Sequence, residues 1–170
     1  EDVSAEEVAE EYKEWMRERW NHACVVIWDG QNETVTPVTG EAISMVRHAD
    51  MSNRPWDNGW SAPQSEDDVM ETHPYLFSAY REGPAPSEQG ALADKLTRFR
   101  IPGNGPSDRS KTGKRFRNPI VINEYAWLWL NRDGTTTTLT DEVYKKVLGE
   151  ETTVEQRRRY YAMTLAALTE

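Results

Sequence analysis

The chain has 170 residues, a length that corresponds to about one domain. Lys and Arg number 20 against 29 Asp and Glu, so the formal net charge is −9. This charge argues against binding to nucleic acid or to an anionic membrane surface, because both need a basic face. No apolar run approaches the roughly 18 residues of a membrane-spanning helix. The 7 Trp, 7 Tyr and 3 Phe argue against intrinsic disorder, since disordered segments are poor in aromatic residues.

The first part of the chain predicts a helix, a strand and a second helix. Residues 4–21 carry apolar side chains at helical spacing, and Ser4 with Glu7 matches a capping box. Residues 23–28 form a continuous apolar run, which predicts a strand buried on both faces. Cys24 lies inside this run and is therefore expected to be a core residue. The second helix is predicted from about Thr39 to Ala49.

The remainder predicts two strands, a long loop and two helices. A short strand is predicted over residues 68–72 and a buried one over 119–123. Between them, residues 82–118 are rich in Gly, Pro, Ser and basic side chains, which predicts a long surface loop with a short helix over about 88–99. Helices are predicted over 141–148 and from Thr153 to the end, with Gln156 in capping-box spacing. Strands alternating with helices predict an α/β fold with a parallel sheet.

Two glutamates follow the two strongest predicted strands. Glu33 comes shortly after the strand at 23–28, and Glu124 directly continues the strand at 119–123. In α/β barrels the active site lies at the C-terminal ends of the strands, and glycoside hydrolysis needs two carboxyl groups facing one sugar ring. One must be protonated and the other ionised. The alternative interpretations are a solvated loop acid at Glu33 and, at Glu124, a buried acid paired with an arginine such as Arg132.

The segments around both glutamates resemble glycoside hydrolase family 2. The first segment consists of residues 17–28 followed by Asn32-Glu33, and it is similar to the family's acid/base signature. It contains Asn21-His22-Ala23-Cys24, then aliphatic residues and Trp28, and it has Ala-Cys where the family has Pro-Ser. Residues 118–126 (NPIVINEYA) are similar to its nucleophile segment. The resemblance implies a (β/α)8 TIM barrel, of which residues 1–170 would form a part: strands four to seven with their flanking helices, truncated at both ends.

The resemblance also implies the chemistry, that of a retaining, exo-acting β-glycosidase similar to β-galactosidases and β-glucuronidases. Glu33 would be the general acid/base and Glu124 the nucleophile, and retention predicts a separation of roughly 5–5.5 Å between their carboxyl groups. Asn32 would bond the sugar 2-hydroxyl, and Tyr75 stands where the wider clan often has a tyrosine bonded to the nucleophile. Trp56 and Trp129 are further candidates for an aromatic sugar platform. The expected substrate-binding residues are Asn32, Asp57, Trp60, His73, Tyr75, Tyr125 and Trp127.

Two rival functions stay open, a barrel that binds carbohydrate without hydrolysing it and an endo-acting glycanase of the same clan. Residues 103–114 lack the Walker spacing, and one Cys with three scattered His gives no zinc motif, so neither a cofactor nor a metal is expected. The expected partners are a carbohydrate substrate and the missing barrel strands and accessory β-domains of a parent chain. We therefore expect the isolated chain to be inactive or poorly stable. The sugar, the linkage, the oligomeric state and the compartment stay open.

Overall fold

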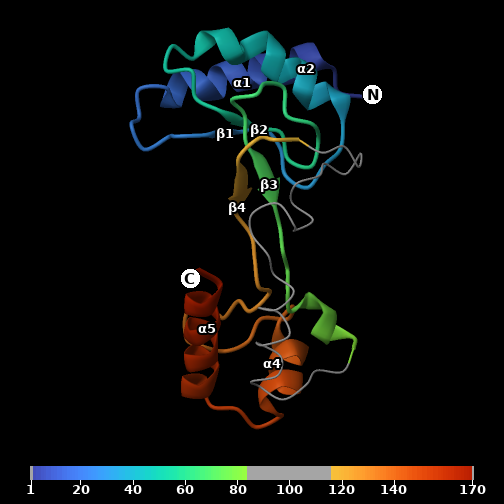
Figure 1. The fold of residues 1–170 in the computed structure, drawn as a ribbon, viewed down its shortest axis with the longest axis vertical. Coiled ribbons are helices and arrows are strands. Elements are labelled where there is room, and N and C mark those ends of the chain that lie inside the picture. The colour runs from blue at the N-terminus through green and yellow to red at the C-terminus, as the bar shows by residue number, and fades with distance from the viewer. Residues whose placement is uncertain (1, 84–115, 170) are drawn as a thin grey trace. The chain divides into compact units, whose positions relative to one another are not determined.

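A computed structural model describes residues 2–83 and 116–169 of the chain, which divides into two compact units (Figure 1). The described part of unit 1 consists of residues 2–72 and 116–123. The described part of unit 2 consists of residues 73–83 and 124–169. Most of the loop predicted at 82–118, including its helix at 88–99, lies outside the described residues.

Unit 1 begins with helix α1, Ala5–Arg19, where the sequence predicts a helix. Its capping box is formed as expected: the Glu7 N–H donates to the Ser4 hydroxyl at 3.2 Å, and the Ser4 N–H donates to the Glu7 carboxylate at 2.9 Å. These two bonds satisfy backbone groups that a helix start leaves unpaired. The predicted start of this helix is therefore confirmed.

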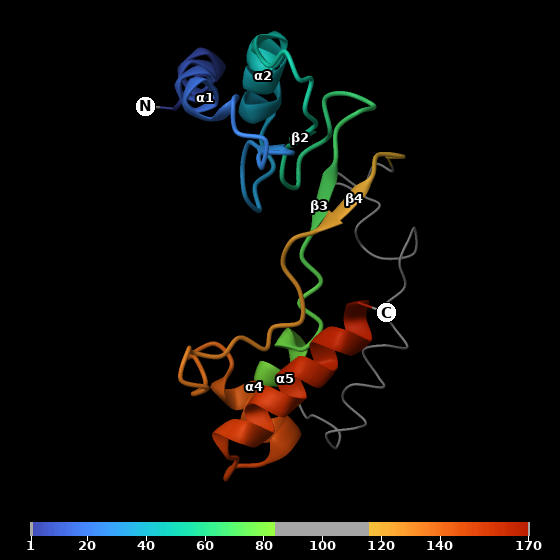
Figure 2. The ribbon, with the colours of Figure 1, turned by 90° about the vertical axis from the view of Figure 1, so that its left-hand side faces the viewer.

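The second helix of unit 1, α2, spans Pro37–Val46 and continues into the 3-10 turn η1, Arg47–Ala49. The Thr36 hydroxyl caps it by accepting from the Val38 N–H at 3.3 Å, and Pro37 occupies the first turn, where no N–H is needed. Helices α1 and α2 pack against each other, as Figure 2 shows. The helix predicted at 39–49 thus exists but starts two residues earlier.

The four strands in the described part of unit 1 are short and run parallel to their neighbours. Strand β1 (Trp28–Asp29) pairs with β2 (Trp56–Asp57), and β3 (Met70–Thr72) pairs with β4 (Ile120–Ile122). A parallel bridge between Asp57 and Val69 joins the end of β2 to the residue before β3. The strands are therefore neighbours in chain order, each in the same direction as the last.

The buried strand predicted over residues 23–28 is wrong for most of its length. Only Trp28 belongs to a strand, Cys24 is exposed, and Val26 is 66% exposed. The reason is a turn before β1: the Val25 N–H donates to the His22 carbonyl at 3.1 Å, so this N–H is bonded within the turn and not to a neighbouring strand. An apolar run does not by itself fix which of its residues enter a sheet.

The core of unit 1 lies between its helices and the first two strands. Trp28 and Trp56 are fully buried, and the Trp15 ring meets Trp28 edge-on with centroids 5.0 Å apart. Met16 and Ile43 complete this core from α1 and α2. The expectation that Trp56 forms part of a sugar platform is wrong, because a side chain with no exposed surface has no face to offer a ligand.

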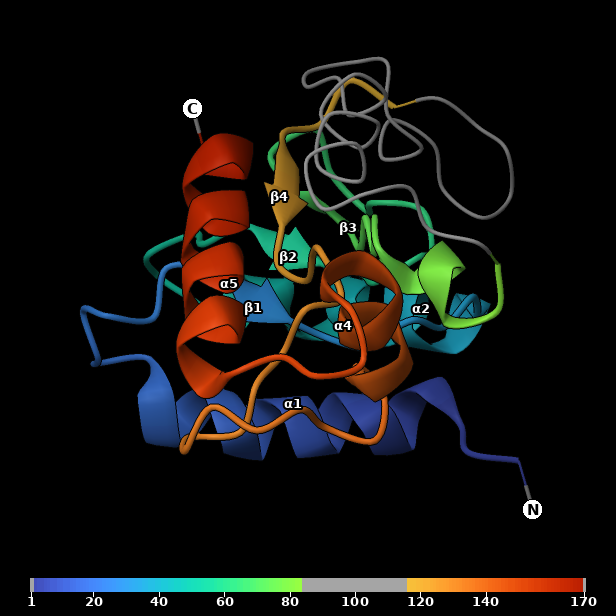
Figure 3. The ribbon, with the colours of Figure 1, turned by 90° about the horizontal axis from the view of Figure 1, so that it is seen from below.

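Unit 2 contains the 3-10 turn η2 (Ser78–Arg81) and the helices α4 (Asp141–Leu148) and α5 (Val154–Thr169). Both helices were predicted by the sequence, and the Thr153–Gln156 capping box forms with bonds of 2.8 and 3.2 Å. Helix α4 packs on η2 and α5, and Figure 3 shows the two helices from below. Across residues 2–83 and 116–169, no helix is both long and apolar enough to cross a membrane. The unit 2 core comprises Phe77, Tyr80, Ala126, Leu128, Val143, Tyr144, Val147 and Tyr160.

Candidate functional site

The loop that follows β1 carries Asn32 and Glu33. Asn32 is exposed, and its carbonyl accepts a bond from the Thr34 hydroxyl at 2.9 Å. Glu33 has a φ of 47°, in the left-handed region that costs a non-glycine residue about 1–3 kcal/mol. Such a conformation persists only where its surroundings enforce it. The backbone at Glu33 is therefore held in place by neighbouring groups.

The loop after β2 supplies part of that restraint. The Gln31 amide donates to the Asn58 carbonyl at 2.8 Å, and the Thr36 N–H donates to the Ser61 hydroxyl at 3.0 Å. Asn58 also accepts from the Thr39 hydroxyl at 2.8 Å. Residues on both sides of Glu33 are thus tied to residues 58–61. Trp60 stands in this second loop and is partly exposed.

Two buried carboxyl groups lie on neighbouring strands of unit 1. Asp57, the last residue of β2, is 4% exposed, and Glu71, in the middle of β3, is 5% exposed. Burial, together with the negative charges of Glu71 and Asp29, raises the pKa of Asp57 to about 7. Asp57 was expected to bind substrate, and its burial leaves little surface for a ligand. Its carboxyl group exchanges a proton near neutral pH.

The Glu71 carboxylate has hydrogen-bonding neighbours on both of its oxygens. Its Oε2 accepts from the Asn123 side-chain amide at 2.6 Å, and its Oε1 lies 3.5 Å from the backbone N–H of Glu33. The first contact has the short length of a charge-assisted bond, and the second is a long one. Glu71 therefore touches the residue before Glu124 in the chain as well as Glu33 itself.

In unit 2, Glu124 is brought together with two of the other predicted residues. The Tyr75 hydroxyl donates to Glu124 Oε2, and His73 Nε2 lies 3.9 Å from Glu124 Oε1. The His73 side chain is 2% exposed, whereas that of Glu124 is 39% exposed. The alternative of a buried acid is wrong for Glu124, because its side chain reaches solvent. A half-exposed carboxylate with a tyrosine hydroxyl on one oxygen is accessible to a small ligand.

Two further aromatic rings pack next to Tyr75, whose hydroxyl bonds to this carboxylate. The Trp127 ring meets the Tyr75 ring edge-on with centroids 4.8 Å apart, and Trp129 lies 4.7 Å from Trp127. Both tryptophans are partly exposed, and so is Tyr125. The guanidinium of Arg81 sits 5.7 Å above the Trp127 ring, within the range of a cation–π contact. Partly exposed aromatic rings can pack against the apolar face of a sugar.

The backbone after Glu124 is strained and clamped. Ala126 and Trp127 have φ values of 68° and 76°, both in the left-handed region. The Ala126 N–H donates to the Pro74 carbonyl at 3.2 Å, and the Ala126 carbonyl accepts from the Phe77 N–H at 2.8 Å. These bonds fasten residues 124–127 to the segment that carries His73 and Tyr75.

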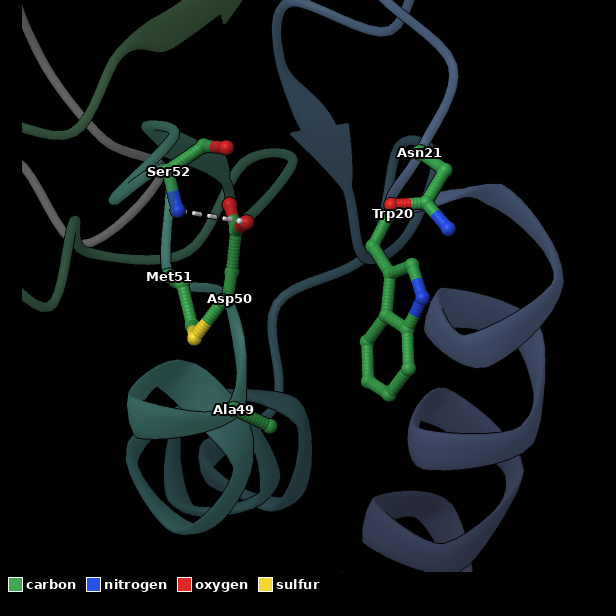
Figure 4. A pocket seen from close by; sticks show the side chains of 6 residues that line it. All are labelled: Trp20, Asn21, Ala49, Asp50, Met51 and Ser52. Carbon is green, nitrogen blue, oxygen red and sulfur yellow. Dashed lines mark hydrogen bonds between the residues drawn. The ribbon is translucent and has the colours of Figure 1, made fainter.

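Two cavities of unit 1 lie away from the predicted residues. One, of about 300 Å³, is lined by Trp20, Asn21, Ala49, Asp50, Met51 and Ser52, with the Trp20 indole facing Met51 and Asp50 across it in Figure 4. Its walls come from the segments that precede β1 and β2, so it belongs to the opposite strand ends from Glu33 and Asp57. The other, of about 270 Å³, is lined by residues 35–40 and 58–64 in part.

Glu71 and Asn123 are two site residues that the motifs do not single out. The signal for Glu71 is its position in a predicted strand: an ionisable side chain in the buried strand Met70–Thr72 costs free energy unless it is paired or functional. Asn123 lies inside the segment 118–126 that resembles the nucleophile region, directly before Glu124. Its contact with Glu71 joins segments 52 positions apart, which only the tertiary structure reveals.

Comparison with known proteins adds no relative: the chain matches no protein-family model, no curated protein and no solved structure. The resemblance to glycoside hydrolase family 2 therefore rests on the segments around Glu33 and Glu124 and on the residues that surround them.

Proposed function

We propose that the chain is part of the catalytic barrel of a retaining β-glycosidase, with Glu33 as the general acid/base and Glu124 as the nucleophile. The observation that carries the proposal is the bond from the Tyr75 hydroxyl to the half-exposed Glu124 carboxylate. A hydrogen-bond donor on one oxygen holds the carboxyl group in a fixed orientation and leaves the other oxygen to react.

The order of the strands supports the barrel. Strands β1 to β4 are parallel and neighbour one another in chain order. Each is followed at its C-terminal end by proposed site residues: Glu33 after β1, Trp60 after β2, Tyr75 after β3 and Glu124 after β4. Active sites of (β/α)8 barrels are built from this end of the strands, and four consecutive strands correspond to strands four to seven of such a barrel.

The proposed reaction has two steps. In the first, the Glu33 carboxylic acid protonates the glycosidic oxygen while the Glu124 carboxylate attacks the anomeric carbon, so that the bond to the leaving group breaks and a glycosyl ester forms on Glu124. In the second, Glu33 takes a proton from water, whose oxygen attacks the same carbon and frees Glu124. Two inversions give net retention, and Glu33 ends the cycle protonated.

The proposal is tested on the natural polypeptide that contains these 170 residues, with a panel of aryl β-glycosides. Glu124→Gln is expected to abolish turnover, because an amide is a poor nucleophile, while the matched control Glu142→Gln on the surface of α4 retains it. In Glu124→Ala, added azide is expected to restore cleavage and to give a glycosyl azide of inverted configuration.

The role of Glu33 is tested by the leaving group. Glu33→Gln is expected to slow substrates with poor leaving groups far more than dinitrophenyl glycosides, which depart without protonation. Unchanged turnover in Glu124→Gln would refute the assignment. Saturable sugar binding without any hydrolysis by the wild-type protein would instead favour a carbohydrate-binding barrel, and random cleavage inside a polysaccharide would favour an endo-acting glycanase.

A further inference from the structure

The buried carboxylate of Glu71, in the middle of β3, contacts Glu33 in the loop after β1 and Asn123 directly after β4. Its 2.6 Å bond from Asn123 and its 3.5 Å contact with the Glu33 N–H use both oxygens. At 5% exposure it is largely withdrawn from solvent, so it offers little surface to a substrate. Removing a charge from water is costly, and a carboxylate remains in such a place only where fixed donors replace its hydration.

The two groups that donate to Glu71 differ: one is a backbone N–H and the other is a side-chain amide. One is the backbone of Glu33, whose φ of 47° needs an external restraint. The other is the side chain of Asn123, the residue that precedes Glu124 in the sequence. One side chain from β3 thus contacts Glu33, one of the two proposed catalytic glutamates, and Asn123, the residue before the other.

We propose that Glu71 is a positioning residue for both proposed catalytic glutamates, with one carboxylate oxygen holding the backbone of Glu33 and the other holding Asn123 ahead of Glu124. This inference rests on the proposed function for its catalytic meaning. The contacts themselves involve no substrate and can be tested separately.

A carboxylate suits this position better than an amide. It accepts on both oxygens, whereas a glutamine at position 71 has one acceptor and one donor, so it can serve both partners only if Asn123 turns its amide around. Glu71→Gln therefore keeps the volume and part of the bonding but removes the charge. Loss of a charged acceptor weakens both hydrogen bonds, because charge-assisted bonds are about twice as strong as neutral ones.

Ionisable groups near Glu71 are expected to make its hydrogen bonds sensitive to pH. The charge of Asp57 on β2 interacts with those of Glu71 and of Asp29 on β1, and Tyr12 of α1 interacts with Asp29. The pKa of Asp57 is raised to about 7 by burial and by the charges of Glu71 and Asp29. The negative charge next to Glu71 therefore changes near neutral pH, and donors bonded to Glu71 report that change.

The experiment is nuclear magnetic resonance on the natural polypeptide that contains these 170 residues, isotopically labelled. In the wild type, couplings transmitted across the hydrogen bonds are expected from the Asn123 side-chain nitrogen, and more weakly from the Glu33 backbone nitrogen, to the Glu71 carboxyl carbon. The Glu33 amide proton is expected to shift with pH, with a midpoint near 7. In Glu71→Gln this pH-dependent shift is expected to be largely lost, whereas the control Glu66→Gln, at an exposed site, retains it.

The wild-type measurement alone can overturn the proposal, whatever the stability of the variant. Absence of both couplings, together with a Glu33 amide shift that does not change between pH 5 and 9, would refute it. In the natural polypeptide, Glu71→Gln is expected to lower kcat on the order of 10²-fold with little change in KM. Couplings observed without any glycosidase activity would refute the proposed function but retain the contact, and an unchanged kcat would refute the positioning role.

Discussion

Replacing Asp57 with asparagine tests how much the buried carboxyl group costs unit 1. In the unfolded chain this group has its ordinary pKa of 3.8, and in the folded protein burial and the charges of Glu71 and Asp29 raise the pKa to about 7. At about 1.36 kcal/mol per pKa unit, the difference corresponds to about 4 kcal/mol as an upper bound. This is a large fraction of the 5–15 kcal/mol that typically stabilises a domain.

The direction in which the free energy of unfolding changes with pH depends on whether the folded or the unfolded state holds the proton of Asp57. Below pH 3.8 both states are protonated, and the free energy of unfolding carries no penalty from Asp57. Between pH 3.8 and 7 only the folded state keeps the proton, so the free energy of unfolding falls as the pH rises. Above pH 7 both states have lost the proton and the full cost is present. Asp57→Asn has no charge to bury, so it is expected to be more stable than the wild type at pH 8 and to show a weaker pH slope.

The assay is urea unfolding at several pH values between 4 and 8.5. It is followed by the indole N–H signals of Trp28 and Trp56, both fully buried in the core of unit 1. The control Asp67→Asn, at an exposed position in the connection between β2 and β3, is expected to follow the wild-type pH dependence. Parallel pH curves for the wild type and Asp57→Asn would refute the reasoning, because they would mean that the group has the same pKa in both states.

Two further substitutions probe the contacts in each unit. Tyr75→Phe removes the hydroxyl that donates to Glu124. Because a hydrogen bond to a charged group is worth about 1.5–3 kcal/mol, turnover of the natural polypeptide is expected to fall by about 10- to 10²-fold. Tyr161→Phe, on the surface of α5, is the control, and equal rates in the two variants would contradict the prediction. Asp50→Ala removes the carboxylate that accepts from the Arg54 guanidinium at 2.7 Å in the wild type. Because a largely buried charge then loses its ionic partner, the free energy of unfolding is expected to fall by about 3–5 kcal/mol in urea titrations. An effect below about 1 kcal/mol would contradict this prediction.

Much of the local structure follows from the sequence through short-range chemistry. Helix α1 begins at its Ser4–Glu7 capping box and α5 at Thr153–Gln156, because these bonds join residues three positions apart and form wherever the backbone turns into a helix. The strand ends that carry Asn32-Glu33 and Glu124 are also marked in the sequence. There a polar pair or an acid follows an apolar run, and such a change in polarity is a local signal.

Other features depend on pairing that no local pattern encodes. The apolar run at 23–28 satisfies a strand pattern, yet Val25 bonds back to His22 and only Trp28 finds a parallel partner, Trp56. The same run leaves Cys24 exposed. A hydrophobic side chain can be buried at low cost, whereas the pairing with the neighbouring strand decides whether that side chain is buried in the fold.

The amino-acid sequence by itself singled out Glu33 and Glu124 as the proposed catalytic residues, because the order of residues around them resembles that of a glycosidase. The tertiary structure decided what surrounds them: the Tyr75 hydroxyl on Glu124, the burial of Asp57, and the link from Glu71 to Asn123. These contacts join residues 49 and 52 positions apart in two of the three cases cited. The cost of burying a charge and the direction of a hydrogen bond depend on distance in space, which the fold sets.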